Sequence, residues 1–152
     1  MAMEVRLRRD LDRAKAALTA GGHTCVLCMD DSMLISADRG ISPILDWMEA
    51  ERDIGGYCAA DKVVGKAAAL LFALAGIAAV YGETMSTSAM AALERCGIPY
   101  EYSNSAAFII NRAGTGPCPM ELSVAGIDDP ALAKEAILKA RHRLRIGEGS
   151  RA

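Results

Sequence analysis

The segment around Cys118 has the residue types of a reactive site. Two glycines and two prolines shape the loop that contains it, Gly114-Thr115-Gly116-Pro117-Cys118-Pro119. Pro119 suits the first position of a helical turn and would place Cys118 at the N-cap, where the helix start stabilises a thiolate. Glu121 would lie within one turn as an acid or base, or as a simple capping carboxylate. Because no histidine lies nearby in sequence, the loop is either catalytic or purely structural.

A second candidate lies at the predicted start of a central helix, residues 62–75. Asp61 precedes this apolar stretch, so we expect its carboxylate to cap the helix. With Lys62 and Lys66 nearby, the free N–H groups could hold an anion. The phosphate-loop motif itself is absent, since it requires glycine at Ala60 and Ser or Thr at Ala67. An ordinary capped helix is the alternative.

The cysteines and histidines do not suggest a metal site. Cys25 and Cys28 form a CxxC, but on a strand residues three apart point to opposite faces. No second CxxC or close pair of histidines follows. We therefore expect free thiols, no zinc and no cofactor.

Composition excludes several classes of function. Hydrophobic residues make up 52% of the 152 residues and charged residues 24%, as in one globular domain. A net charge of −2 argues against nucleic acid as a partner, since binding its phosphate backbone needs a basic surface. Neither a secretory signal nor an apolar run long enough to span a bilayer is visible, so we expect a cytoplasmic protein without membrane contact.

Hydrophobic periodicity and turn residues predict the elements. We expect helices over residues 3–20, 42–52 and 62–75, a helix ending at Cys96-Gly97, and a last helix over residues 130–145 capped by Asp128 or Asp129. Strands are expected over residues 24–29, 33–37, 77–81, 98–102 and 106–111, the last two paired antiparallel. Residues 1–146 would form one domain and residues 147–152 a flexible tail.

This order of elements predicts an α/β fold, with one mixed sheet of about five strands between two layers of helices. Ligands collect where loops gather at the carboxyl ends of strands in such sheets. A polar turn predicted over residues 83–88 would bring Glu83, Ser86 and Ser88 to that edge.

The element order, with Ala-Asp-Lys-Val-Val-Gly-Lys-Ala-Ala at 60–68 and Gly-Pro-Cys-Pro-Met-Glu at 116–121, resembles an uncharacterised prokaryotic family assigned the cytidine-deaminase-like fold. Zinc deaminases carry a His-x-Glu at the central helix and a Pro-Cys-x-x-Cys at the next strand-to-helix turn. Residues 61–63 and 83–88 supply neither motif. The resemblance thus implies the fold and a site in the same place, without the deaminase reaction.

Two functions follow from these observations. The first is a domain that binds an unknown small molecule or catalyses a metal-independent reaction. Its catalytic candidates are Cys118, Glu121 and Asp61, and its ligand-binding candidates are Lys62, Lys66, Glu83, Ser86, Ser88, Asn111 and Arg112. The alternative is a non-enzymatic interaction module or homo-oligomer that uses its basic terminal helices or the helix containing Trp47. One cavity lined by Cys118, Asp61 and Lys66 would favour the first.

Overall fold

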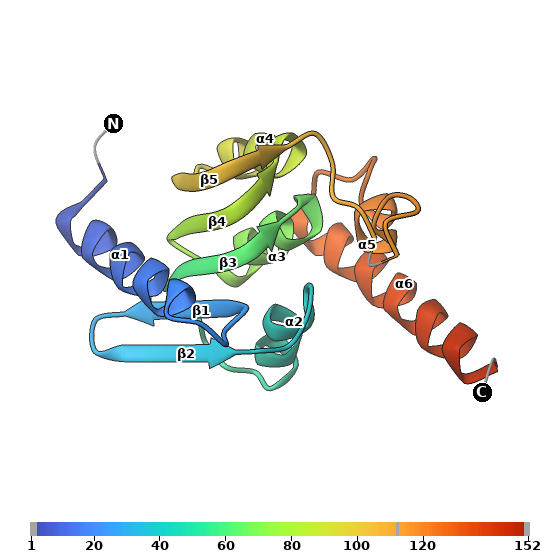
Figure 1. Ribbon diagram of the computed structural model, residues 1–152, viewed down its shortest axis with the longest axis horizontal. Helices are drawn as coiled ribbons and strands as arrows, with labels where there is room; N and C mark the ends of the chain where they lie inside the picture. Colours follow the sequence, from blue (N-terminus) through green and yellow to red (C-terminus); the bar gives the residue numbers. More distant parts are fainter. Residues whose placement is uncertain (1–2, 112, 151–152) are drawn as a thin grey trace.

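A computed structural model describes residues 3–111 and 113–150, with the side chains of residues 147–150 left out (Figure 1). It contains one five-stranded sheet in the order β2-β1-β3-β4-β5. The strands are β1 (Cys25–Met29), β2 (Ser32–Ser36), β3 (Cys58–Val64), β4 (Ala79–Ser86) and β5 (Tyr100–Ala106). The helices are α1 (Val5–Thr19), α2 (Ser42–Glu49), α3 (Lys66–Ala75), α4 (Thr87–Arg95), α5 (Pro119–Ser123) and α6 (Pro130–Ser150).

The sheet lies between two layers of helices, as predicted. Helix α1 packs against β1, β3 and β4 on one face, through Leu11, Ala14 and Leu18. Helices α2, α3 and α4 pack on the other face, and α6 lies against α3 (Figure 1). The predicted α/β class, with one mixed sheet of about five strands, is confirmed.

The first two strands form the predicted hairpin. Strand β1 pairs antiparallel with β2, and Asp30 in the turn between them has a φ of 51°. Aspartate tolerates this left-handed conformation better than most residues. Cys25 belongs to the core on the α3 side and Cys28 to the core under α1, so the two thiols point to opposite faces. Both are free and buried.

The predicted start of the central helix, at residue 62 with Asp61 as its cap, was wrong. Residues 58–64 form β3, a strand paired antiparallel with β1 and parallel with β4, so α3 starts at Lys66 rather than Lys62. Asp61 therefore lies inside the sheet and does not cap α3, whose N-cap residue is Gly65. Asp61 and Lys62 led to the prediction of a helix start, because charged residues are common there, although the other residues of β3 are apolar.

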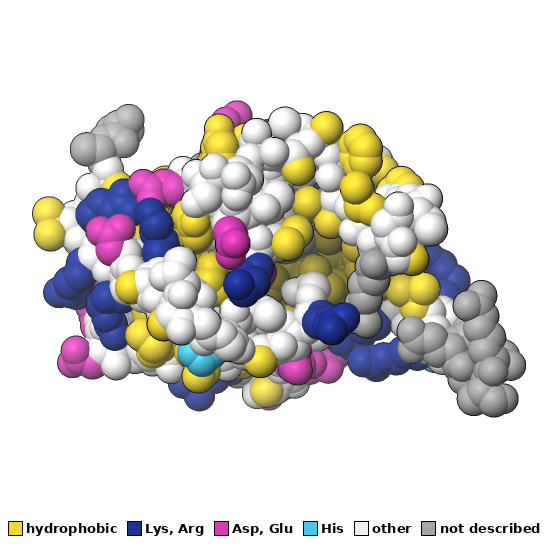
Figure 2. Space-filling model, viewed as in Figure 1, with side chains coloured by type: hydrophobic (Ala, Val, Ile, Leu, Met, Phe, Trp, Pro, Cys, Tyr) yellow, Lys and Arg dark blue, Asp and Glu magenta, His cyan; other side chains and the backbone are white. Residues whose placement is uncertain are grey.

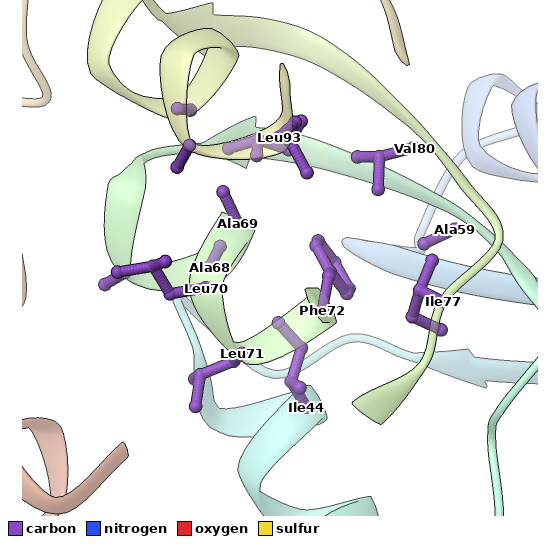
Figure 3. Packing of buried hydrophobic residues seen from close by; sticks show 14 of the residues in the cluster. Ile44, Ala59, Ala68, Ala69, Leu70, Leu71, Phe72, Ile77, Val80 and Leu93 are labelled. Carbon is purple, nitrogen blue, oxygen red and sulfur yellow. The ribbon is translucent and has the colours of Figure 1, made fainter. Parts of the chain in front are cut away.

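Helix α3 is the centre of the core. Its residues from Lys66 to Phe72 are all buried, which requires contacts around most of its circumference. Phe72, Leu70 and Leu71 pack among Ile44 of α2, Val80 of β4 and Leu93 of α4 (Figure 3). Because the side chains of the alanines at 67–69 are small, neighbouring elements can pack close to α3. The helix ends as predicted, with Gly76 in the left-handed conformation at a φ of 80°.

The predicted polar turn over residues 83–88 does not exist. Strand β4 continues to Ser86, and α4 begins at Thr87 without an intervening loop. The Ser86 hydroxyl accepts a hydrogen bond from the Ala89 N–H at 3.1 Å and so caps α4. The polar side chains that suggested a turn belong to the end of a strand and a helix cap.

The predicted antiparallel pair over residues 98–102 and 106–111 was also wrong. A single strand, β5, runs parallel to β4 at the edge of the sheet. The chain then leaves the sheet over residues 107–111 and 113–118, with an isolated bridge between Ile110 and Pro117. Helix α5 follows with Cys118 as its N-cap residue and Pro119 in its first turn, as expected.

The boundaries of two other helices differ from those predicted. Helix α2 ends at Glu49 rather than near Arg52, and its N-cap residue is Ile41 without a side-chain hydrogen bond. Helix α6 continues past Arg145 to Ser150 and so includes part of the segment expected as a tail. Asp129 caps α6, because its carboxylate accepts the Ala131 N–H at 2.8 Å. No helix in the described ranges is long and apolar enough to cross a membrane.

Candidate functional site

A pocket of about 430 Å³ lies where the starts of α3 and α4 meet the segment that follows β5. Because β3 and β4 are parallel, the helices that follow them begin at the same edge of the sheet. Residues 108–128 close the pocket from the other side. Its lining comprises Lys66, Ser88, Ala91, Arg95, Phe108, Ile109, Pro117, Glu121, Leu122, Ala125 and Asp128.

Glu121 closes the pocket by binding the start of α3. Its Oε1 accepts the Lys66 N–H and its Oε2 accepts the Ala67 N–H, each at 2.7 Å. These are two of the N–H groups that the first turn of a helix leaves without a partner. Gly65 makes this approach possible, since a Cβ at that position would lie 2.3 Å from Oε1. The anion predicted at the start of α3 is thus a carboxylate of the chain itself.

Two cations of the pocket share one carboxylate. The Lys66 Nζ lies 3.2 Å from Oδ1 of Asp128, and Nη2 of Arg95 lies 3.0 Å from the same oxygen. The ammonium of Lys66 also donates a hydrogen bond to the Ala125 carbonyl at 3.2 Å. The lysine side chain is only 11% exposed, whereas that of Asp128 is 66% exposed. A buried ammonium is therefore neutralised by an acid at the surface.

The remaining walls of the pocket are mostly apolar. Phe108 and Ile109 come from the segment after β5, Leu122 from α5 and Ala91 from α4. Phe108 is 63% exposed and Leu122 60% exposed. Ser88 adds a hydroxyl, which lies 3.1 Å from the Ser86 hydroxyl. The pocket thus has a charged side and an apolar side.

Only some of the predicted site residues meet in this pocket. Lys66, Ser88 and Glu121 line it, although they come from three separate segments. Ser86 lies next to it as the buried cap of α4.

Cys118 and Asn111 belong to the neighbouring loop and are absent from the pocket lining. The Asn111 side chain makes two hydrogen bonds to Thr115. Its Nδ2 donates to Oγ1 of Thr115 at 3.2 Å, and its Oδ1 accepts the backbone N–H of Thr115 at 3.1 Å. Cys118 is half-buried, and its N–H donates to the Ile109 carbonyl. Asn111 thus holds the loop in shape, and Arg112 lies outside the described residues.

Asp61 lies in the sheet, away from the lining of the pocket. It is 4% exposed and stands opposite Cys25 of β1 and Gly82 of β4. Its Oδ1 accepts the Val63 N–H at 3.3 Å, whereas Oδ2 has no hydrogen-bond partner among the described residues. Burial raises the pKa of this carboxyl from 3.8 to about 7, against the opposing effects of the Val63 N–H, the Cys25 thiol and the Lys62 N–H.

Lys62 and Glu83 form a separate pair on neighbouring strands. Their charged atoms are 3.6 Å apart and both side chains are about half exposed. Neither residue lines the pocket. An exposed pair of this kind contributes little to stability, and it lies apart from the cations that face the pocket.

Sequence reasoning missed Arg95, Phe108 and Asp128. Arg95 lies two turns into α4, where the sequence offers the ordinary signal of a basic residue in a last turn. Phe108 was assigned to a strand and Asp128 to a helix cap. Phe108 could be recognised as a surface residue only once β5 was known to end at Ala106.

Among the side chains that the structure describes, those of residues 3–111 and 113–146, no group of three or more His, Cys, Asp or Glu could hold a metal ion. The described pocket offers two cations, a hydroxyl and two carboxylates that already have partners. These groups suit hydrogen bonding and charge pairing with a small molecule.

Comparisons with known proteins agree with the architecture. The crystal structure of a DUF1893 family protein (TM1506) from Thermotoga maritima superposes with a TM-score of 0.76 at 22% identity, covering 93% of this chain and 92% of that one. A dCMP deaminase from the cyanophage S-TIM5, in apo form, gives a TM-score of 0.43 at 13% identity over 66% of this chain and 99% of that one, which is too low to argue from.

No curated protein matches the sequence. A family model described as TM1506, a domain of unknown function (DUF1893), matches residues 13–140. This match runs from the middle of α1 to the middle of α6 and thus includes the whole sheet and every residue that lines the pocket. The chain therefore belongs to the TM1506 (DUF1893) family.

Proposed function

We propose that this protein is a small-molecule-binding domain whose ligand occupies the pocket between α3, α4 and residues 108–128. The observation that supports it is the convergence of Lys66, Ser88 and Glu121 from three segments, together with Arg95, on one pocket. A volume of about 430 Å³ lies within the range of sites for small ligands. The mixture of apolar walls and a few charged groups is also typical of such sites.

The arrangement favours binding over catalysis. Cys118, the proposed nucleophile, is not part of the lining, and Asp61 is buried between strands. Nucleophilic catalysis requires a nucleophile within hydrogen-bond reach of a base. The hydroxyl of Ser88 lies instead beside another serine hydroxyl. The pocket residues therefore have roles in recognition in this proposal.

Ligand-observed NMR with a library of small polar and aromatic fragments tests this proposal. Ala91→Phe would fill the pocket from α4, and Ala16→Phe adds the same side chain to an exposed position on α1. We expect fragments that bind the wild-type protein to bind Ala16→Phe equally and to lose binding to Ala91→Phe, with circular dichroism showing that both variants are folded. Equal binding to both variants, or no binding fragment at all, would contradict the proposal.

A second candidate is an interaction module that contacts another copy of the chain. Exposed apolar side chains at Phe108, Ile110 and Leu122 favour it, and Figure 2 shows hydrophobic side chains gathered over the region of residues 106–122 at its upper right. The basic residues of α1 favour it less, because Arg8 and Lys15 are already paired with Glu101 of β5. Trp47 is likewise partly buried against the core.

Sedimentation velocity over a hundredfold range of concentration tests this second candidate. Ile110 does not line the pocket, so Ile110→Ser would weaken a self-association without removing a ligand contact. Ile35→Ser, which removes an equally exposed isoleucine on β2, is the control. A single monomeric species at all concentrations would contradict the interaction module and leave the binding pocket as the function to test.

A further inference from the structure

The charged side of the pocket has an arrangement that suits one kind of ligand group. Lys66 and Arg95 come from different helices, and their charged nitrogens lie 3.2 Å and 3.0 Å from a single oxygen, Oδ1 of Asp128. A carboxylate oxygen is thus already held between two cations. Charge-assisted hydrogen bonds of this type are shorter and stronger than those between neutral groups.

The carboxylate that occupies this position is the least buried member of the cluster. Asp128 lies in the connection between α5 and α6, and its side chain is 66% exposed, against 11% for Lys66. An aspartate at the surface loses little by turning into water, whereas a buried ammonium must keep an anionic partner. Asp128 is therefore replaceable by another anion, provided that the incoming group neutralises Lys66.

Glu121 does not provide that neutralisation. Both of its oxygens accept backbone N–H groups of α3, from Lys66 and Ala67 at 2.7 Å. The carboxylate is fixed against Gly65 and points at the helix start. Lys66 and Arg95 carry two positive charges between them, and Asp128 is the carboxylate that both of them contact.

The apolar side of the pocket defines the rest of the ligand. Phe108 and Leu122 are more than half exposed, and Ala91, Ile109 and Pro117 complete the wall. Covering such surface with an apolar group is favourable, at roughly 25 cal/mol for each Å² removed from water. An aromatic ring or a short alkyl chain attached to the anion would cover it.

We propose that the pocket binds a small monocarboxylate with an apolar or aromatic body, whose carboxylate takes the place of Asp128 between Lys66 and Arg95. This inference rests on the proposed function and adds the chemical class of the ligand to it. Asp128 acts as an internal competitor in this arrangement. Removing its charge frees the two cations and strengthens binding of an external carboxylate.

Titration of the full-length protein with benzoate, followed by ¹H–¹⁵N NMR, tests the inference. Benzamide is the matched neutral probe, because it has the same shape without the charge, and phenyl phosphate is the dianionic probe. We expect benzoate to shift the resonances of α3 and α4 and to bind at least tenfold more tightly than benzamide, since only an anion pairs with the two cations. Benzoate should also bind more tightly than phenyl phosphate, since the group that the two cations now hold is a planar carboxylate.

Changes in the affinity for benzoate among three variants test where its carboxylate binds. Asp128→Asn is expected to bind benzoate several-fold more tightly, whereas Glu135→Gln, the same change at an exposed position of α6, leaves the affinity unchanged. Arg95→Gln, at a half-exposed position, is expected to weaken binding about tenfold through the loss of one charge-assisted hydrogen bond. An unchanged affinity in Asp128→Asn and Arg95→Gln would overturn the inference.

The two proposals fail in different ways. Equal binding of benzamide and benzoate that Ala91→Phe abolishes would overturn the carboxylate inference and leave the pocket as a binding site. Tighter binding of phenyl phosphate than of benzoate would also overturn it, in favour of a dianion. Absence of binding by all three probes would overturn it as well, and the fragment library would then decide the proposed function separately.

Discussion

Replacing Asp61 by asparagine should stabilise the protein at neutral and alkaline pH. Asp61 is 4% exposed inside β3, and its Oδ2 has no hydrogen-bond partner among the described residues. Burial raises the pKa of this carboxyl from 3.8 to about 7. At 1.4 kcal/mol for each tenfold change in proton affinity, the difference corresponds to roughly 4 kcal/mol. That free energy is the cost of holding an ionised carboxylate in the sheet.

The sign follows from the proton balance of the two states. Below about pH 4 the carboxyl is neutral in both the folded and the unfolded chain, and it has no effect on the pH dependence. Between about pH 4 and pH 7 the unfolded chain loses the proton while the folded chain keeps it, so stability falls as the pH rises. Above about pH 7 both states are ionised and the cost is constant. The side chain of asparagine has a similar shape but does not ionise, so it avoids this cost.

Urea denaturation at pH 4.5, 6, 7 and 8 measures the effect. The free energy of unfolding of Asp61→Asn, minus that of the wild-type protein, should increase by roughly 3 kcal/mol between pH 4.5 and pH 8. Asp31→Asn, at an exposed position in the β1–β2 turn, should give a flat difference. A flat difference for Asp61→Asn, or a variant less stable at pH 8, would refute the reasoning.

Three further predictions concern the ends of the helices. Gly65→Ala should cost roughly 2 kcal/mol in the wild-type background and much less in Glu121→Ala, because the three heavy atoms nearest to a Cβ at residue 65 all belong to the Glu121 carboxylate, the first at 2.3 Å. Additive losses in a double-mutant cycle would contradict this contact. Ser86→Ala should cost about 1 kcal/mol through loss of the α4 cap, and Ser88→Ala only a few tenths; equal losses in urea denaturation would exclude the cap. Iodoacetamide at pH 6.5 with peptide mapping should label Cys118 before any other thiol, since Cys118 precedes a helix start. Burial raises the pKa of Cys25, Cys28 and Cys58, so these three thiols should react only when the chain unfolds. Faster labelling of the exposed Cys96, which follows α4, would contradict this order.

The elements with regular periodicity were predicted correctly. Helix α1 and the hairpin of β1 and β2 agree with their predictions within two residues, and glycines end α1 and α3 as expected. Helix α1 and strand β2 have alternately more and less exposed positions, and α3 ends at a glycine, so that the local pattern matches the environment.

The wrong predictions concern strands that contain polar residues. Asp61 and Lys62 interrupt the apolar pattern of β3, which led to the prediction of a helix cap. Glu83, Thr84 and Ser86 are polar although they belong to β4, and residues 100–106 are mostly polar because β5 is an edge strand. Pairing with neighbouring strands overrides local propensity at such positions, and no pattern within the segment records that pairing.

The sequence by itself determined the class of the fold and the helical turn that follows Cys118, because these depend on periodicity, prolines and glycines close together in the chain. The tertiary structure decided which residues meet. Only the parallel pairing of β3, β4 and β5 brings the starts of α3 and α4 to one edge, and only the path of residues 107–128 places Glu121 on α3 and Asp128 between Lys66 and Arg95. Contacts of this kind join residues at least 20 positions apart, and their geometry follows from strand order and packing, which local sequence does not encode.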